Sequence, residues 1–363
     1  MVLMLNGHGG NIYALAQRLE CAPSDIIDMS SNVNPLDPLP GLVEFLVNNI
    51  SAITALPQVD AKSAVQAFAA RYNINPEHVI AGNGTTQFIY AIPQVLETKK
   101  ALIFGPTYAD YADACSMHNV RYDYMMAEEP FDFKLDVDAV IEQIKDHDTV
   151  FICNPNNPTG ALMLKTDLER LCRLHPDTHF VIDESYLPFV YDSDQLSILP
   201  GRLPNVLVLN SMSKIFRIPG LRIGFLIASG QNIEKFRPFQ LPWNVNSMAQ
   251  TAVDYLMKNT DETDAFIGKT VLLLEDQRKF MADIFKDADH IKLFPSKTSF
   301  LLAKLDEKIT ADMLCEHLAA DRILIRNCSN FRGLSEHFIR ISLKTPDINR
   351  MLADKIINFL QQI

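Results

Sequence analysis

A lysine close to a serine and an arginine is the first group in the sequence that could carry out covalent chemistry. The stretch SMSKIFRIPGLRIGF (211–225) places Lys214 three residues after Ser211 and eight residues before Arg222. A lysine amine can form a Schiff base with a carbonyl compound, while a hydroxyl and a guanidinium beside it can hold a phosphate. An isolated lysine would be a solvated loop residue, so the prediction depends on these neighbours.

An acidic residue at the end of an expected strand offers a second chemical function. Asp183 and Glu184 follow the apolar run in HFVIDES (179–185), and Tyr186 comes three residues after Asp183. A carboxylate beside a pyridine nitrogen keeps that nitrogen protonated, so that the ring can accept electrons from a bound substrate. Taken alone, a carboxylate at this position more often caps the next helix.

Three loops could hold the rest of a ligand. In GNGTT (82–86), backbone amides and threonine hydroxyls precede an apolar helical stretch, where they could bind an anion. GPTYADY (105–111) ends a strand with Tyr108, which could stack on a planar ring or simply pack at the strand end. NPNNPTG (154–160) has two Asn-Pro pairs and a glycine, which is more specific than turn formation requires.

Short β-rich runs alternate with amphipathic segments through the middle of the chain. This alternation predicts an α/β fold with a mostly parallel sheet flanked by helices. In such a sheet, ligands bind beyond the carboxyl ends of the strands, and the polar residues described above stand at those ends. The expected strands are ALIFGP (101–106), TVFICNP (149–155), HFVIDES (179–185), NVLVLNS (205–211) and IGFLIA (223–228).

The pattern changes at about residue 246, where long helical segments precede three β-rich runs separated by helix-like ones. This second pattern indicates a smaller α+β domain. The first 40 residues are rich in Gly, Asn and Pro and fit neither pattern. We therefore predict an arm over 1–40 that reaches the small domain and the active site, a large domain over 41–245, and a small domain over 246–363.

The composition excludes several classes of protein. The 363 residues carry 33 Lys and Arg against 44 Asp and Glu, a net charge of −11, which disfavours nucleic acid and anionic membranes as partners. No apolar run approaches the roughly 18–20 residues of a membrane helix, and the first residues lack the pattern of a signal peptide. The six cysteines show neither C-x-x-C pairs nor zinc spacing, so we expect reduced thiols, no metal and a cytoplasmic protein.

In their order along the chain, the five motifs resemble those of fold-type I pyridoxal-phosphate enzymes, the aspartate-aminotransferase superfamily, and the resemblance covers essentially the whole chain. It implies pyridoxal 5'-phosphate as the cofactor, held covalently by Lys214, with Asp183 paired to the pyridinium nitrogen. Tyr186 and Asn157 would hydrogen-bond the phenolic oxygen, and Tyr108 would stack on the ring. The residues implied around the cofactor phosphate are Thr85, Thr86, Ser211, Ser213 and Arg222.

The same resemblance implies a substrate-binding arginine and a homodimer. Arg340, in FIRISL (338–343), matches the arginine that grips the substrate α-carboxylate, a task that suits a bidentate guanidinium. Relatives commonly have a tyrosine that reaches the cofactor phosphate of the neighbouring subunit. Here Leu56, in ALPQVD (55–60), stands at that position, which puts this contact in doubt but not the dimer.

Within the superfamily, the chain resembles the subgroup that contains histidinol-phosphate aminotransferase and the threonine-phosphate decarboxylase of cobalamin synthesis. Both act on an amino compound that carries a phosphate, which implies a second cationic pocket. The candidates for this pocket are His8, Asn32 and Arg326, with Arg332 a weaker one.

Two runs resemble the decarboxylase more than the aminotransferase, namely HGGN (8–11) and ILIR-x-C-x-N-x-x-GL (323–334). They imply decarboxylation of L-threonine O-3-phosphate, or of L-serine O-phosphate, to a phosphorylated amino alcohol for cobalamin side-chain synthesis. The alternative is a histidinol-phosphate-type aminotransferase that uses 2-oxoglutarate and glutamate. Tyr186 slightly favours this alternative, because such decarboxylases can carry Phe at that position and aminotransferases usually carry Tyr.

Overall fold

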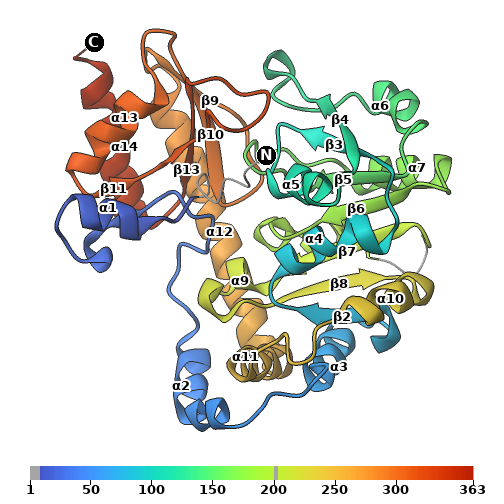
Figure 1. The fold of residues 1–363 in the computed structure, drawn as a ribbon. Coiled ribbons are helices and arrows are strands. Elements are labelled where there is room, and N and C mark those ends of the chain that lie inside the picture. Colours follow the sequence, from blue (N-terminus) through green and yellow to red (C-terminus); the bar gives the residue numbers. More distant parts are fainter. Residues whose placement is uncertain (1–8, 200–202, 363) are drawn as a thin grey trace.

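A seven-stranded sheet forms the centre of the larger part of the molecule in the computed structural model, which describes residues 9–199 and 203–362 (Figure 1). Its strands are β2 (Val79–Gly82), β3 (Lys100–Gly105), β4 (Arg121–Met126), β5 (Thr149–Cys153), β6 (His179–Asp183), β7 (Val206–Ser211) and β8 (Gly224–Ala228). Their order in the sheet is β2-β8-β7-β6-β5-β3-β4. The strands from β4 to β7 run parallel, whereas β8 is antiparallel to both β7 and β2. The predicted mostly parallel sheet is therefore confirmed.

Burial explains which strands the sequence revealed. The five predicted strands, β3 and β5 to β8, are apolar runs with almost every residue buried, as expected for strands covered on both faces. Their observed bounds agree with the predicted ones to within two residues at each end. We did not predict β4, an edge strand with exposed residues in alternation, or β2, which has only four residues.

Helices pack around this sheet, and two of them begin where a strand ends. The helix α4 follows the Gly-Asn-Gly turn behind β2, and α9 follows β7 and carries Lys214. The helices of this part are α2 (Pro40–Asn48), α3 (Lys62–Arg71), α4 (Thr85–Val95), α5 (Asp110–Met117), α6 (Val137–Ile144), α7 (Lys165–Leu174), α8 (Ser193–Leu196), α9 (Met212–Ile215), α10 (Gly230–Phe236) and α11 (Ser247–Lys258). Although α11 lies in the range predicted for the small domain, it packs against α2 and α3.

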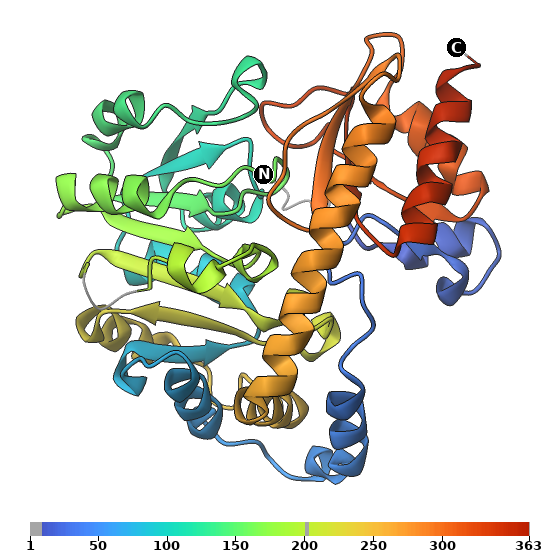
Figure 2. The ribbon, with the colours of Figure 1, turned by 180° about the vertical axis from the view of Figure 1, so that it is seen from behind.

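A four-stranded antiparallel sheet forms the centre of the smaller part of the molecule. Its strands are β9 (Ile291–Leu293), β10 (Phe300–Leu305), β12 (Arg326–Asn327) and β13 (Phe338–Ser342), in the order β12-β13-β10-β9. The helices α13 (Ala311–Ala320) and α14 (Pro346–Leu360) pack with it. The 26-residue helix α12 (Thr260–Phe285) runs from α11 along the molecule to this smaller part (Figure 2). Within the described ranges, no helix is both long and apolar enough to cross a membrane.

The arm joins the two parts of the molecule. It begins with α1 (Ile12–Arg18), a helix that the Gly-, Asn- and Pro-rich composition did not predict. Next, β1 (Ile27–Asp28) pairs in parallel with β11 (Ile323–Leu324) on the smaller part. The chain then reaches α9, where the Asn34 amide donates a hydrogen bond to the Lys214 carbonyl oxygen at 3.0 Å. The arm therefore links the smaller sheet to the helix that carries the lysine.

Candidate active site

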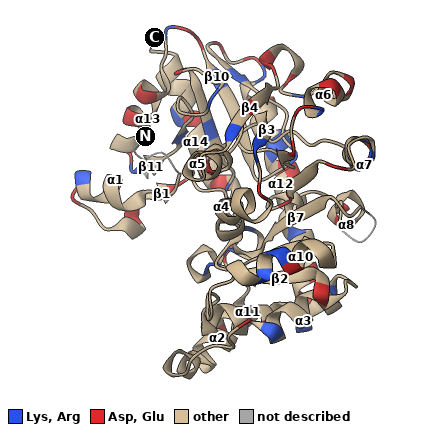
Figure 3. Cartoon of the chain, turned by 45° about the vertical axis from the view of Figure 1, so that its right-hand side comes forward, with Lys and Arg blue, Asp and Glu red and all other residues tan. Residues whose placement is uncertain are grey.

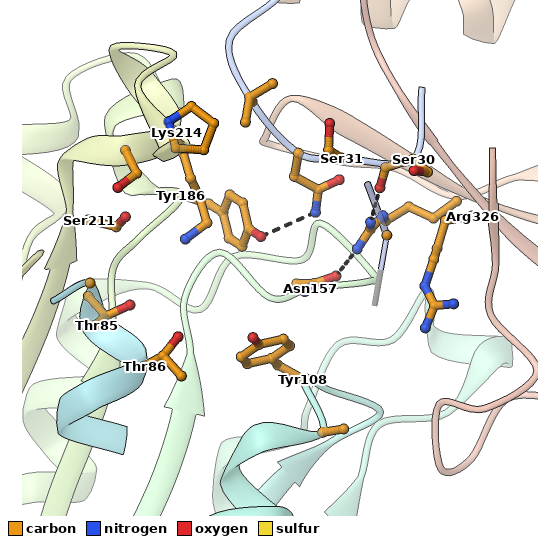
Figure 4. Close-up of a pocket in the computed structure, with 18 of the residues that line it drawn as sticks. Ser30, Ser31, Thr85, Thr86, Tyr108, Asn157, Tyr186, Ser211, Lys214 and Arg326 are labelled. Atoms are coloured by element: carbon orange, nitrogen blue, oxygen red, sulfur yellow. Dashed lines mark hydrogen bonds between the residues drawn. The ribbon is translucent and has the colours of Figure 1, made fainter. Parts of the chain in front are cut away.

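A cavity of about 240 Å³ lies where the carboxyl ends of the central strands meet the arm and the smaller sheet (Figure 4). Asp183 is buried at the end of β6, behind the cavity wall, and the predicted residue His8 lies outside the described residues. The predicted residues that line the cavity are Asn32, Thr85, Thr86, Tyr108, Asn157, Tyr186, Ser211, Ser213, Lys214, Arg222, Arg326 and Arg340.

Lys214 is placed by the sharp turn from β7 into α9. Its Nζ lies 4.9 Å from the centre of the Tyr186 ring. Burial lowers the pKa of Lys214, and the nearby carboxylate of Asp183 partly opposes this effect. The neutral amine, which is the nucleophilic form, is therefore more populated at a given pH here than in a solvated lysine.

Asp183 is held from two sides. The hydroxyl of Tyr111 donates a hydrogen bond to Oδ2 at 2.9 Å, and the backbone amide of Ser185 donates to Oδ1 at 2.9 Å. Tyr111 was missed in the sequence, where the available signal was the second tyrosine of GPTYADY, three residues after Tyr108 and therefore close to it in a helical turn.

The start of α4 and Arg222 form one cluster of donors. A Cβ atom on Gly84 would lie 2.5 Å from Nη2 of Arg222, and one on Gly224 would lie 2.6 Å from the amide nitrogen of Thr85. Only glycines allow this close approach, which sets a guanidinium against the amides of a helix N-terminus. Such a set of donors fits the phosphate of pyridoxal phosphate.

The two serines of the lysine motif differ in their contacts. Ser213 Oγ donates a hydrogen bond to the backbone oxygen of Ile223 at 3.1 Å, so its hydroxyl proton is committed to the backbone. Ser211 is also buried and lines the same wall of the cavity. Of the two, Ser211 is therefore the better candidate for donating to a phosphate.

A chain of hydrogen bonds fixes Tyr186. Its hydroxyl accepts a hydrogen bond from Asn32 Nδ2 at 3.2 Å (Figure 4). Asn32 Oδ1 in turn accepts a hydrogen bond from Ser342 Oγ at 2.7 Å. The Tyr186 ring also packs edge-on against Phe300, with 5.1 Å between ring centres. Asn32, predicted as a substrate ligand, thus orients a cavity tyrosine in this structure.

Tyr108 lines the cavity from the segment just before α5. Its ring packs edge-on against Tyr111, with 5.9 Å between ring centres. Burial and the Asp110 carboxylate raise its pKa well above the ordinary value, so the hydroxyl stays protonated.

Arg340 connects three segments of the cavity wall. From β13, its Nη1 donates to Asn157 Oδ1, and its Nη2 donates to the Ser30 backbone oxygen at 2.6 Å. Its Nε has no hydrogen-bond partner among the described atoms. Because Arg340 binds the carbonyl oxygen of the Asn157 side chain, the amide nitrogen of Asn157 is left as a donor.

Arg326 and Arg332 are separated by a short loop and lie in different places. Arg326 lines the cavity, donates to Asn330 Oδ1 at 2.7 Å and lies over the Phe331 ring, 5.3 Å from its centre. Arg332 is not among the lining residues and lies over the Tyr124 ring, 4.7 Å from its centre. Asn330 and Phe331 also line the cavity and were missed in the sequence.

The chain from residue 24 to residue 356 matches the family model of aminotransferase class I and II. Threonine-phosphate decarboxylase from Salmonella typhimurium is 29% identical over 370 residues, which cover 100% of this chain and 99% of the relative. A bifunctional protein of adenosylcobalamin biosynthesis from Leptospira interrogans is 32% identical over 359 residues, or 97% of this chain. The match spans 41% of that longer protein.

Two solved structures share the fold. The structure of L-threonine-O-3-phosphate decarboxylase from Porphyromonas gingivalis has a TM-score of 0.82 at 30% identity and covers 93% of this chain and 100% of its own. Histidinol-phosphate aminotransferase from Clostridium acetobutylicum has a TM-score of 0.85 at 26% identity, with the same two coverages. The likeness thus extends to a decarboxylase and to an aminotransferase.

Proposed function

The chain belongs to the aminotransferase class I and II family, as a pyridoxal-phosphate-dependent enzyme of fold type I, and within this family we propose that it decarboxylates a phosphorylated amino acid. The proposed substrate is L-threonine O-3-phosphate and the product is a phosphorylated aminopropanol for cobalamin side-chain synthesis. L-serine O-phosphate is a close variant, since one methyl group in a pocket is worth only about 1–3 kcal/mol. The names of two relatives, a threonine-phosphate decarboxylase and an adenosylcobalamin biosynthesis protein, support this proposal.

The observation that carries the proposal is the position of Arg326. It lines the same cavity as Lys214 and Arg340, and Figure 4 shows it on the opposite side of the cavity from Lys214. A substrate whose amine lies at Lys214 can therefore reach one arginine with its carboxylate and another with a distal phosphate. Acidic and basic residues are interspersed over the rest of the molecule (Figure 3), so the net charge of −11 does not describe this cavity.

The chain's own residues would direct the reaction by holding the substrate. Bound pyridoxal phosphate supplies an electron sink that weakens whichever bond to the substrate Cα stands perpendicular to its ring. Arg340 and Arg326 would grip the carboxylate and the phosphate, and this double grip fixes the rotation about Cα. Lys214 Nζ would then deliver a proton to Cα after carbon dioxide has left.

Other cavity residues would hold the cofactor. Asp183 would keep the ring nitrogen protonated, and Tyr186 and Asn157 would donate to the phenolic oxygen. Tyr108 would stack on the ring. The residues proposed for the cofactor phosphate are Thr85, Thr86, Ser211, Ser213 and Arg222. Ser213 would donate to the phosphate only after its hydroxyl gives up the hydrogen bond to the backbone oxygen of Ile223, and would otherwise only contact the phosphate.

A histidinol-phosphate-type aminotransferase with 2-oxoglutarate or glutamate as the second substrate is the alternative. The presence of Tyr186 beside Lys214 and the likeness to the Clostridium aminotransferase support it. In that reaction Lys214 would take a proton from Cα instead of delivering one. The two reactions therefore differ in which bond Arg340 and Arg326 place perpendicular to the ring.

The deciding experiment measures release of carbon dioxide from L-threonine O-3-phosphate without any added keto acid. The proposal expects stoichiometric carbon dioxide and a phosphorylated aminopropanol. Turnover of histidinol phosphate that requires 2-oxoglutarate, with no carbon dioxide from threonine phosphate, would overturn the decarboxylase in favour of the aminotransferase.

An exposed apolar surface supports the proposed homodimer. We define this surface as Val43, Val47, Ile50, Ile53, Leu56, Val59, Leu241 and Trp243, all of them exposed. Its two segments lie side by side, because the Trp243 amide donates to the Val59 carbonyl oxygen at 3.0 Å. Exposed apolar patches of this kind typically mark a protein interface. With Leu56 in this surface, the partner would present a methyl group where relatives present a hydroxyl.

The same proposal assigns a different role to each part of the chain. The arm (1–40) and the small domain (246–363) would bind the substrate, while the large domain (41–245) would carry the cofactor. Arg326 and Arg340 come from the smaller sheet, whereas Lys214 and Asp183 come from the larger one. We place the protein in the cytoplasm, with reduced cysteines.

A further inference from the structure

We propose that Tyr111 is a positioning residue, which fixes the Asp183 carboxylate in the orientation needed to pair with the ring nitrogen of the cofactor. The inference rests on the role assigned to Asp183 and extends it to a residue outside the cavity lining. It starts from the 2.9 Å hydrogen bond between the Tyr111 hydroxyl and Asp183 Oδ2.

The carboxylate is held at both of its oxygens. Tyr111 binds Oδ2, and the Ser185 amide binds Oδ1 at 2.9 Å. Asp183 is 5% exposed and Tyr111 is 1% exposed, so water does not compete freely for these bonds. With two donors in fixed positions, the carboxylate cannot rotate about its last side-chain bond without losing one of them.

Tyr111 is itself immobilised. Its ring stacks on Phe151 of β5, with 5.4 Å between ring centres, and meets the edge of Tyr108 at 5.9 Å. Burial, followed by the charge of Asp183, raises its pKa well above the ordinary value. The hydroxyl therefore remains a donor throughout the physiological pH range.

The segment that leads from β3 into α5 thereby serves two sides of the cofactor at once. Tyr108 faces the cavity, while Tyr111, three residues later, reaches the carboxylate behind it. A shift of this segment would move the stacking ring and the carboxylate together. The structure thus couples the position of the cofactor ring to the charge that keeps its nitrogen protonated.

The test is Tyr111→Phe, which keeps the stacked ring and removes only the hydroxyl. We expect the dissociation constant of pyridoxal phosphate for the cofactor-free protein to rise about tenfold, the usual scale for one hydrogen bond to a charged group. The pKa seen in the visible absorbance of the lysine-bound cofactor should rise. A loosened Asp183 lets the ring nitrogen lose its proton, and the positive charge that opposed protonation at the lysine nitrogen is then lost.

Tyr72→Phe is the matched control. Tyr72 packs at a tilt against Phe68, with 4.7 Å between ring centres, directly after α3 and away from the cavity lining. The Tyr72→Phe variant should leave both the dissociation constant of pyridoxal phosphate and the absorbance pKa unchanged. Unchanged or lowered values of the absorbance pKa in Tyr111→Phe, together with an unchanged dissociation constant, would overturn the proposal, even if the variant were less stable.

A double variant separates a role of Tyr111 through Asp183 from a direct effect of Tyr111 on cofactor binding. Asp183→Asn with Tyr111→Phe should bind the cofactor as weakly as Asp183→Asn alone, because Tyr111 acts through Asp183. A further tenfold loss in the double variant would overturn the proposal. None of these readouts needs a substrate, so a failed decarboxylase assay and a failed role for Tyr111 are distinguishable.

Discussion

Arg340 Nη2 donates a hydrogen bond to the backbone oxygen of Ser30, 2.6 Å away, although the two residues are 310 positions apart in the sequence. Arg340 Nη1 is bound to Asn157 Oδ1 on the loop after β5. One buried guanidinium thus joins the smaller sheet, the arm and the larger sheet. Any substrate that binds Arg340 makes contact with a group on which all three segments depend.

Replacing Arg340 by lysine should separate substrate binding from cofactor binding. A lysine cannot reproduce the planar fork that binds a carboxylate and two protein oxygens together. For Arg340→Lys we expect KM for the amino-acid substrate to rise roughly 10- to 100-fold, as for loss of a charge-assisted hydrogen bond. Steady-state kinetics measures this value, and the visible absorbance of the bound cofactor should persist. An unchanged KM would contradict the role of Arg340.

Replacing Arg326 by alanine should affect phosphorylated substrates selectively. If Arg326 binds the distal phosphate, Arg326→Ala raises KM for threonine phosphate by roughly 10- to 100-fold, with cofactor affinity within twofold of the wild type. Arg332→Ala is the matched control, because Arg332 lies over the Tyr124 ring outside the cavity lining. An equal loss of substrate and cofactor binding in Arg326→Ala would mean that this residue is structural.

The sequence predicted the residues that stand at strand ends. Lys214 and Asp183 follow apolar runs whose length and composition identify buried parallel strands, and the carboxyl ends of such strands meet at one edge. The order of the motifs along the chain then indicated the enzyme family, which implied the chemical role of each residue. No comparable pattern exists for the pairing of Asn32 with Ser342, because it depends on how the arm crosses to a strand 310 positions later.

Loop conformation sets a second limit on prediction. The sequence offers Arg332 as a weaker phosphate ligand beside Arg326, and the loop between them turns Arg332 toward Tyr124. Gly333 explains this turn, since its φ is +92° and a Cβ atom there would lie 2.0 Å from Met126 Cε. The close approach of this loop to the larger sheet is a tertiary contact, which no local sequence signal reports.

The exposed apolar surface should be an interface between two copies of the chain. Placing an aspartate at Ile50, which is 54% exposed, should yield a monomer by analytical ultracentrifugation, because a charge buried in an apolar interface is costly. Leu174→Asp is the control, since Leu174 is 53% exposed at the end of α7, outside this surface. A wild-type protein that sediments as a monomer would refute the prediction directly.

Glu184 should make stability depend on pH. It is a buried carboxyl that accepts hydrogen bonds from Ser197 Oγ at 2.5 Å and from the Ile198 amide at 2.8 Å. Burial raises its pKa from 4.5 to about 7, so the folded protein binds more protons than the unfolded chain between these values. Stability from this group is therefore fully present below pH 4.5 and is lost as the pH rises through 7.

Glu184→Gln removes this titration while keeping the size of the side chain. The unfolding free energy of the wild type minus that of the variant should fall by an amount on the order of 3 kcal/mol between pH 4.5 and pH 8. Urea unfolding of both proteins at each pH measures the difference, in which all other titrating groups cancel. A difference that stays constant or grows with pH would mean that Glu184 is already charged in the folded protein at low pH. Ser197 and Ile198 would then offset the cost of burying the carboxylate.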